Sequence, residues 1–173
     1  MKKYILSALI LLAAGCSKNP LTKRSSLNLI PNSQVLAMSY SQYNQFLSQN
    51  RLSADAAATT MVKNVGSRIA AAVETYLRQQ KLESEIKNYN WEFNLVEDKA
   101  VNAWCMPGGK VVVYTGILPV TQDETGLAVV MGHEIGHAVA KHGNERLSQG
   151  ILAQLGGVAL SVATLNQSPM ARN

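Results

Sequence analysis

His133-Glu134-Ile135-Gly136-His137 is the stretch of sequence that says most about the fold of this chain. If the stretch is helical, its two imidazoles lie one turn apart on one face, where both can reach a single metal ion. The Glu134 carboxylate is rotated away from the helix face that carries the two imidazoles. It can therefore accept a proton from a water molecule at the metal without binding the metal itself. The spacing predicts a metal-binding helix that carries its own general base.

The residues around this motif predict a helix of roughly twenty residues. Thr121-x-x-Glu124 has the form of a capping box, and Gly143 suits the position just after the last helical residue. Gly132 and Gly136 cost about 1 kcal/mol each relative to alanine, which predicts a segment packed close to the backbone there. The apolar residues that recur at helical spacing predict burial: Leu127, Ala128, Val130, Met131, Ile135, Ala138 and Val139.

A helix whose histidines are merely hydrogen-bonded is the structural alternative to a metal site. Burying two histidines and a glutamate without partners is costly, which favours the metal. Cys105 is most simply a small buried apolar residue, and a zinc-ligand role for its sulfur is the weaker alternative. The net charge of +5 is spread over scattered residues, with no basic face and few aromatic residues, so nucleic-acid binding is not expected.

A β-hairpin is predicted immediately before the motif helix. Pro107-Gly108-Gly109 forms its turn, and Lys110 to Thr115 is a β-branched run that forms its second strand. Asn90 to Val96 alternates apolar and polar residues and predicts another strand, whereas Val35 to Gln49 and Ser53 to Gln80 predict helices. The sequence therefore predicts an α+β domain, mostly helical, with a small sheet or hairpin packed beside the motif helix.

The N-terminus has the form of an export signal. Two lysines precede an apolar run from Tyr4 to Ala14, which is too short to span a bilayer. The run ends in Leu12-Ala13-Ala14-Gly15-Cys16, which resembles the lipobox of bacterial lipoproteins. That resemblance implies a lipidated Cys16 and, because Ser17 follows, sorting to the outer membrane. A soluble exported protein cut near Gly15 is the alternative.

Three segments are expected from these signals. Residues 1–15 are a lipoprotein signal peptide, 16–50 a tether and N-terminal segment, and 51–173 the N-terminal part of a metallopeptidase domain. Gly150 to Leu165 is apolar and uncharged but short for a membrane span, so it is expected to be loosely helical.

Roughly residues 55 to 150 resemble the zinc metallopeptidases of family M48, which have the gluzincin form of the zincin fold. A lipobox upstream resembles the LoiP-like lipoprotein branch of that family. The residues that carry the resemblance are Asn102-Ala103, Pro107-Gly108-Gly109, Val112 to Gly116 with Ile117-Leu118, Met131 to His137, and Lys141-His142-Gly143.

The resemblance implies one Zn²⁺ held by His133, His137 and a third ligand, a glutamate on a later helix in a pattern like Glu-x-x-x-Asp. This sequence has no such pattern. Glu145 is the only carboxylate after His137, about 12 Å further along a continuing helix. On such a helix His142 points nearly opposite His133, so it is not counted as a ligand. We therefore expect the sequence to be truncated before the third ligand.

The function expected from these residues is a zinc-dependent metalloendopeptidase acting on exported or misfolded envelope proteins, with Glu134 as the general base. Its partners would be protein substrates and, through Cys16, a membrane. The strand Val111, Val112, Val113 and Tyr114 is expected to be an exposed edge to which substrate adds as a further strand. The alternatives are a catalytically incomplete lipoprotein that acts as a chaperone or assembly factor, and a structural lipoprotein in which the motif is accidental.

Overall fold

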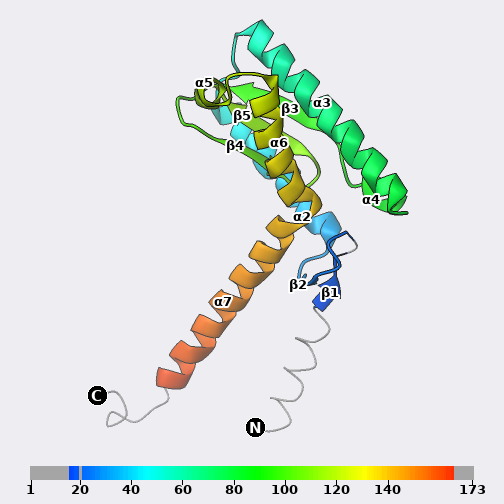
Figure 1. Ribbon diagram of the computed structural model, residues 1–173. Helices are drawn as coiled ribbons and strands as arrows, with labels where there is room; N and C mark the ends of the chain where they lie inside the picture. The colour runs from blue at the N-terminus through cyan, green and yellow to red at the C-terminus, as the bar shows by residue number, and fades with distance from the viewer. Residues whose placement is uncertain (1–15, 20, 166–173) are drawn as a thin grey trace.

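The computed structural model describes residues 16–19 and 21–165, with the backbone alone at 16, 17 and 155–165. It confirms an α+β domain, mostly helical, with a small sheet (Figure 1). The elements in chain order are β1 (Cys16–Lys18), β2 (Ser25–Leu27), α2 (Asn32–Gln49), α3 (Ala56–Gln79), α4 (Glu83–Ile86), β3 (Glu92–Val96), β4 (Ala103–Met106), β5 (Lys110–Tyr114), η1 (Thr115–Ile117), α5 (Leu118–Thr121), α6 (Glu124–Val139) and α7 (His142–Leu165).

The main sheet has three strands in the order β3-β5-β4. The predicted hairpin is confirmed, because β4 pairs antiparallel with β5 across a turn in which Gly108 and Gly109 have φ of 88° and 81°. Such positive angles favour glycine. β3 pairs in parallel with the other side of β5.

The prediction that Val111 to Tyr114 forms an exposed edge is wrong. β5 is hydrogen-bonded on both sides, and Val111, Val112 and Val113 are each 0% exposed. An unbroken β-branched run is typical of a strand buried on both faces, and in this sheet it occupies the centre. The edges of the sheet are β3 and β4.

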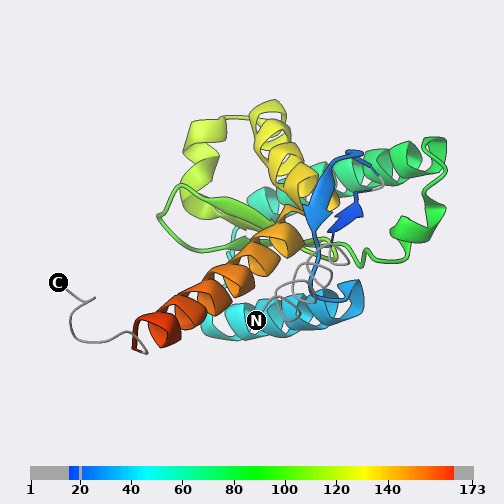
Figure 2. The same cartoon turned by 90° about the horizontal axis from the view of Figure 1, so that it is seen from below.

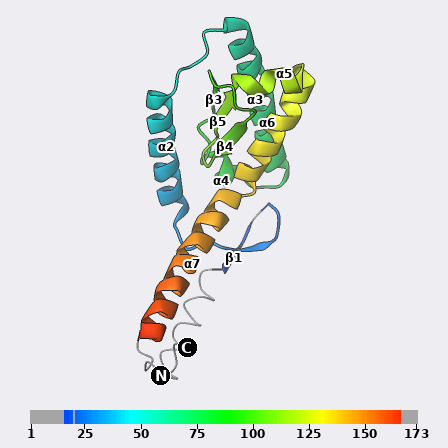
Figure 3. The same cartoon turned by 90° about the vertical axis from the view of Figure 1, so that its left-hand side faces the viewer.

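Helices cover both faces of this sheet. Figure 3 shows the sheet between α2 on one side and α3 with α6 on the other. The side chains of β5 alternate accordingly: Val112 packs with Tyr43 of α2, whereas Val111 and Val113 belong to the larger core under α3 and α6. The buried members of that core are Val62, Val65, Ala70, Phe93, Leu95, Ala103, Val111, Val113, Ile117, Leu127, Met131, Ile135 and Val139.

Side-chain caps define where the two long helices of this layer begin. Asp55 caps α3 by accepting from the Ala58 amide at 2.9 Å, so the helix starts slightly after the predicted Ser53. Asp123 caps α6 by accepting from the Gly126 amide at 2.8 Å. Thr121 is instead the last residue of the short helix α5. The predicted capping box is therefore wrong, and the motif helix begins three residues after Thr121.

The motif helix also ends earlier than predicted. α6 stops at Val139, Lys141 adopts a φ of 57°, and α7 starts at His142 in a new direction. Figure 1 shows the resulting bend and α7 extending away from the body of the molecule. The prediction of one continuous helix to Gly143 is wrong. None of the helices in the described part of the chain is long and apolar enough to cross a membrane.

The segment expected to be a tether is folded against this bend from its first described residues. β1 and β2 form an antiparallel hairpin beside the junction of α6 and α7 (Figure 2). The side-chain Nδ2 of Asn19 donates to the Ala140 carbonyl at 2.7 Å, and the backbone amide of Leu29 donates to Ser148 Oγ at 3.0 Å. Arg24 also pairs with Glu145 of α7. The hairpin therefore holds the two helices at a defined angle.

Candidate metal centre

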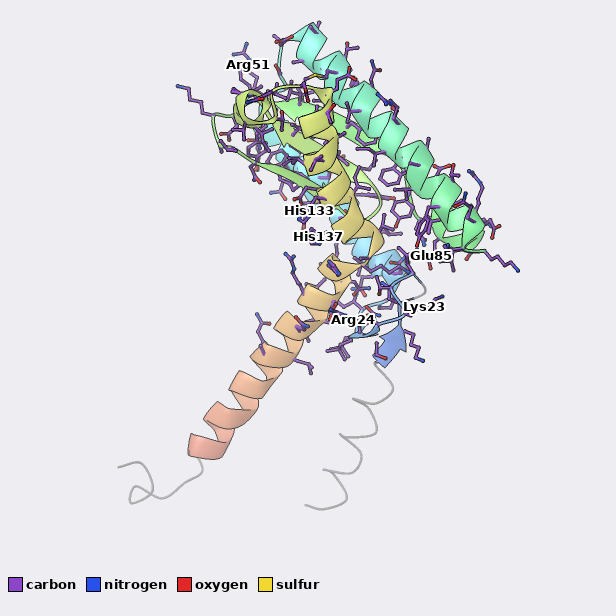
Figure 4. All side chains as sticks on the ribbon, viewed as in Figure 1. Lys23, Arg24, Arg51, Glu85, His133 and His137 are labelled. Carbon is purple, nitrogen blue, oxygen red and sulfur yellow. The ribbon has the colours of Figure 1, made fainter. Side chains whose placement is uncertain are left out.

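The two motif histidines converge as the sequence predicts. They lie one turn apart near the end of α6 that leads to α7 (Figure 4), with 3.0 Å between His133 Nε2 and His137 Nε2. His133 is exposed and His137 is half-buried. Their rings are nearly perpendicular, at 82°. Both nitrogens are thus presented to one point on the solvent side of the helix.

This arrangement fits a zinc ion at two of its ligand positions. Zinc bonds histidine nitrogen at about 2.0–2.1 Å, so two such bonds can span nitrogens 3.0 Å apart. Within the described residues, no group of three or more His, Cys, Asp and Glu side chains could hold a metal ion. His133 and His137 therefore supply a converging pair of nitrogen ligands.

Glu134 is half-buried beside this pair. Within the described part of the chain its carboxylate makes no hydrogen bond or ion pair, so its oxygens remain available to accept a proton. Its negative charge acts on Cys105 of β4. Burial, the larger cause, and the negative charge of Glu134 together raise the pKa of the Cys105 thiol to about 12.

Cys105 consequently remains a protonated thiol at neutral pH. It packs against the main core, as expected of a small apolar residue. A metal would need the thiolate, which this surrounding disfavours. Cys16, the residue predicted to be lipidated, begins β1, but its side chain and residues 1–15 lie outside what the structure describes.

His142 lies beside the motif, contrary to the prediction that it points away. Its Nδ1 is 2.8 Å from His137 Nδ1. This contact cannot be predicted from a continuing helix, which would rotate His142 away from His137. The change of direction occurs at Lys141, and no glycine or asparagine marks it.

The prediction that another segment packs close to the backbone at Gly132 and Gly136 is also wrong for the described residues. A Cβ at Gly132 or Gly136 would meet nothing within 4 Å. These glycines instead line an apolar groove between α3 and α6, to which Leu21 of the N-terminal segment also contributes. The remaining lining residues are Ile69, Ala72, Val73, Tyr76, Ile135 and Val139.

Comparison with known proteins matches residues 67–173 to the family model described as peptidase family M48. The mitochondrial metalloendopeptidase OMA1 of Saccharomyces cerevisiae is 28% identical over 169 residues, covering 90% of this chain and 48% of that protein. OMA1 of Arabidopsis thaliana is 41% identical over 68 residues, covering 39% of this chain and 14% of that protein.

A putative beta-barrel assembly-enhancing protease of Vibrio cholerae is 30% identical over 81 residues, covering 47% of this chain and 14% of that protein. The chain thus spans about half the length, or less, of these curated relatives. The family model covers well over half of the chain and includes the histidine pair and Glu134. This chain belongs to peptidase family M48.

Proposed function

We propose that the protein is a zinc-dependent metalloendopeptidase. The observation that carries the proposal is the 3.0 Å approach of His133 Nε2 and His137 Nε2 on the helix that also bears Glu134. Relatives named metalloendopeptidase in yeast and Arabidopsis support the same class of reaction. His133 and His137 would hold the ion, and Glu134 would act as general base.

Each side chain has a distinct part in peptide hydrolysis. When bound, zinc supplies a Lewis acid that polarises the scissile carbonyl and the attacking water. The Glu134 carboxylate accepts the proton that this water loses on attack, and then delivers it to the departing amine. Because Glu134 has no competing partner among the described residues, it can carry out both transfers without first breaking an ion pair.

The edge strand β4 is the surface we propose for substrate. The Tyr114 amide donates to the Asn102 carbonyl at 3.1 Å, which fixes the alternation of the β4–β5 ladder. By that alternation the backbone groups of Trp104 and Met106 face β5, whereas those of Ala103 and Cys105 face outward. α6 packs against β4, and the charge of Glu134 acts on the Cys105 side chain, so this strand lies near the carboxylate. A peptide added there as a strand would lie across the metal centre.

The substrates we propose are exported or misfolded envelope proteins. The lipobox-like sequence ending at Cys16 supports a lipid-anchored location, with the outer membrane facing the periplasm favoured by Ser17. Relatives in Vibrio cholerae and Yersinia pestis whose names describe beta-barrel assembly-enhancing proteases support a role in the bacterial envelope.

Replacing Glu134 tests the proposal. Glu134→Gln keeps the size of the side chain but cannot accept a proton, so proteolysis of a casein-like substrate should fall at least a hundredfold with zinc content unchanged. Glu124→Gln is the matched control, because it makes the same change at an exposed site on the same helix. It should retain activity.

The outcomes separate the proposed enzyme from its alternatives. Activity of Glu134→Gln within a few-fold of the unaltered protein would end the general-base role. An unaltered protein that binds zinc, prevents aggregation of unfolded envelope proteins and cleaves none of them would favour the chaperone and overturn the peptidase.

A further inference from the structure

We propose that His142 is a positioning residue for His137: its Nδ1 accepts the Nδ1–H of His137 and so keeps His137 Nε2 available for a metal ion. The inference rests on the proposed metal centre. Its geometric basis is the 2.8 Å distance between the two Nδ1 atoms, on the edge of the His137 ring that does not face His133.

A neutral His137 carries a single ring proton, and the nitrogen that holds this proton cannot bind a metal ion. His137 has a neighbour at each nitrogen, His133 Nε2 at 3.0 Å and His142 Nδ1 at 2.8 Å. If His137 carries its proton on Nε2, that nitrogen donates to His133 and has no lone pair for a metal. If it carries the proton on Nδ1, it donates to His142 and Nε2 is free. An acceptor at His142 Nδ1 therefore selects the tautomer that binds metal.

His142 does not reach the same ion as a third ligand in this arrangement. An ion shared by the Nε2 atoms of His133 and His137 lies on one edge of the His137 ring, whereas His142 contacts the other edge. In this geometry His137 can bind the ion, whereas His142 supports the His137 ring without contacting the ion. Partners of this kind hold a ligand ring in orientation and commonly contribute 10- to 100-fold to metal affinity.

The position of His142 depends on the bend between α6 and α7. On an unbroken helix His142 would lie about 140° around the axis from His137. Instead Lys141 takes a φ of 57°, which is unfavourable for a side chain with a Cβ. Three contacts from distant segments hold this conformation: the Asn19 side-chain amide to the Ala140 carbonyl, Lys141 Nζ to Glu85 at 2.8 Å, and Arg24 to Glu145. The fold thus stabilises Lys141 in an unfavourable backbone conformation. That conformation places the His142 imidazole beside His137.

Two substitutions at one position test the proposal. In His142→Asn the side-chain oxygen can occupy the place of Nδ1 and accept the same proton, whereas His142→Leu fills the space without an acceptor. Two properties are measured on the intact protein. Long-range ¹H–¹⁵N spectra of the imidazoles report the tautomer of His137 in the metal-free protein, and competition against a chelator reports zinc affinity.

The unaltered protein and His142→Asn should show the Nδ1–H tautomer of His137. His142→Leu should show a mixture of tautomers and bind zinc 10- to 100-fold more weakly, while His142→Asn stays within about threefold of the unaltered protein. Equal affinity and tautomer in His142→Leu would overturn the proposal. So would a loss in His142→Asn as large as that in His137→Ala, because His142 would then be a ligand.

These readouts keep the two inferences apart. If neither His133→Ala nor His137→Ala changed zinc binding, the proposed metal centre would fail. The tautomer of His137 in the metal-free protein would still decide whether His142 is its hydrogen-bond acceptor.

Discussion

Cys105 shows how a single side chain reports on the surroundings of the general base. Burial and the Glu134 carboxylate raise its pKa to about 12, so at pH 8 the thiolate fraction should be on the order of a thousandfold below that of a free cysteine. Iodoacetamide should therefore modify native Cys105 very slowly and urea-unfolded Cys105 rapidly, as read by mass spectrometry of its peptide. Glu134→Gln should speed the native reaction by removing the negative charge. Equal rates in native and unfolded protein would contradict this placement of Cys105.

The same pKa shift sets the sign of a pH effect on stability. Because the folded pKa lies above that of the unfolded chain, the contribution of Cys105 is present below about pH 9 and is lost as the pH rises towards 12. Tyr43 and Tyr89, whose pKa values burial also raises, add to this loss above pH 10. The difference between the unaltered protein and Cys105→Ala in urea unfolding between pH 8 and 10 isolates the cysteine.

The identities of His133, Glu134 and His137 were predictable because their relation is local. Four residues of helix fix the relative position of the two imidazoles whatever the rest of the fold does. The place of His142 was not predictable, since it depends on a bend held by Asn19 and Glu85, which lie far away in the sequence.

At the scale of elements, the edge strand β4 can be tested by removing one outward amide. Cys105→Pro should raise KM for casein-like substrates about three- to tenfold, the effect of one backbone hydrogen bond, with zinc content retained. Cys105→Ala is the control for loss of the thiol and should leave KM unchanged. Trp104→Pro removes an amide that faces β5 and should lower thermal stability instead. A folded Cys105→Pro variant with normal KM would exclude strand addition at this edge.

Local sequence patterns predict the individual helices and strands, but they do not predict which strands pair with one another. The Pro107-Gly108-Gly109 turn and the β-branched run after it were sufficient to predict the β4–β5 hairpin. The central place of this run in the sheet was not predictable, because it depends on β3, which follows α4 and pairs in parallel with the far side of β5. Parallel pairing joins residues separated by another strand and leaves no periodic signal in either one.

At the scale of the whole molecule, lipidation of Cys16 is the property to test first. Cys16→Ala should leave the protein unlipidated, and therefore uncut by the lipoprotein signal peptidase. Detergent partitioning and the mass of the N-terminal peptide measure both effects. Ser17→Ala, which leaves the cysteine in place, is the control and should be processed normally. An unmodified Cys16, or a mature terminus elsewhere, would contradict the lipoprotein proposal.

The hydrogen bond from the Asn19 side chain to the Ala140 carbonyl has a consequence for where such an enzyme could work. Only three peptide units separate Cys16 from Asn19, so the chain between them spans at most about 11 Å. With acyl chains on Cys16, this short segment would keep the end of α6 that carries His137 close to the lipid surface. Cleavage would then be confined to a thin layer beside the bilayer, and polypeptides held at that surface would be cut in preference to those that diffuse freely.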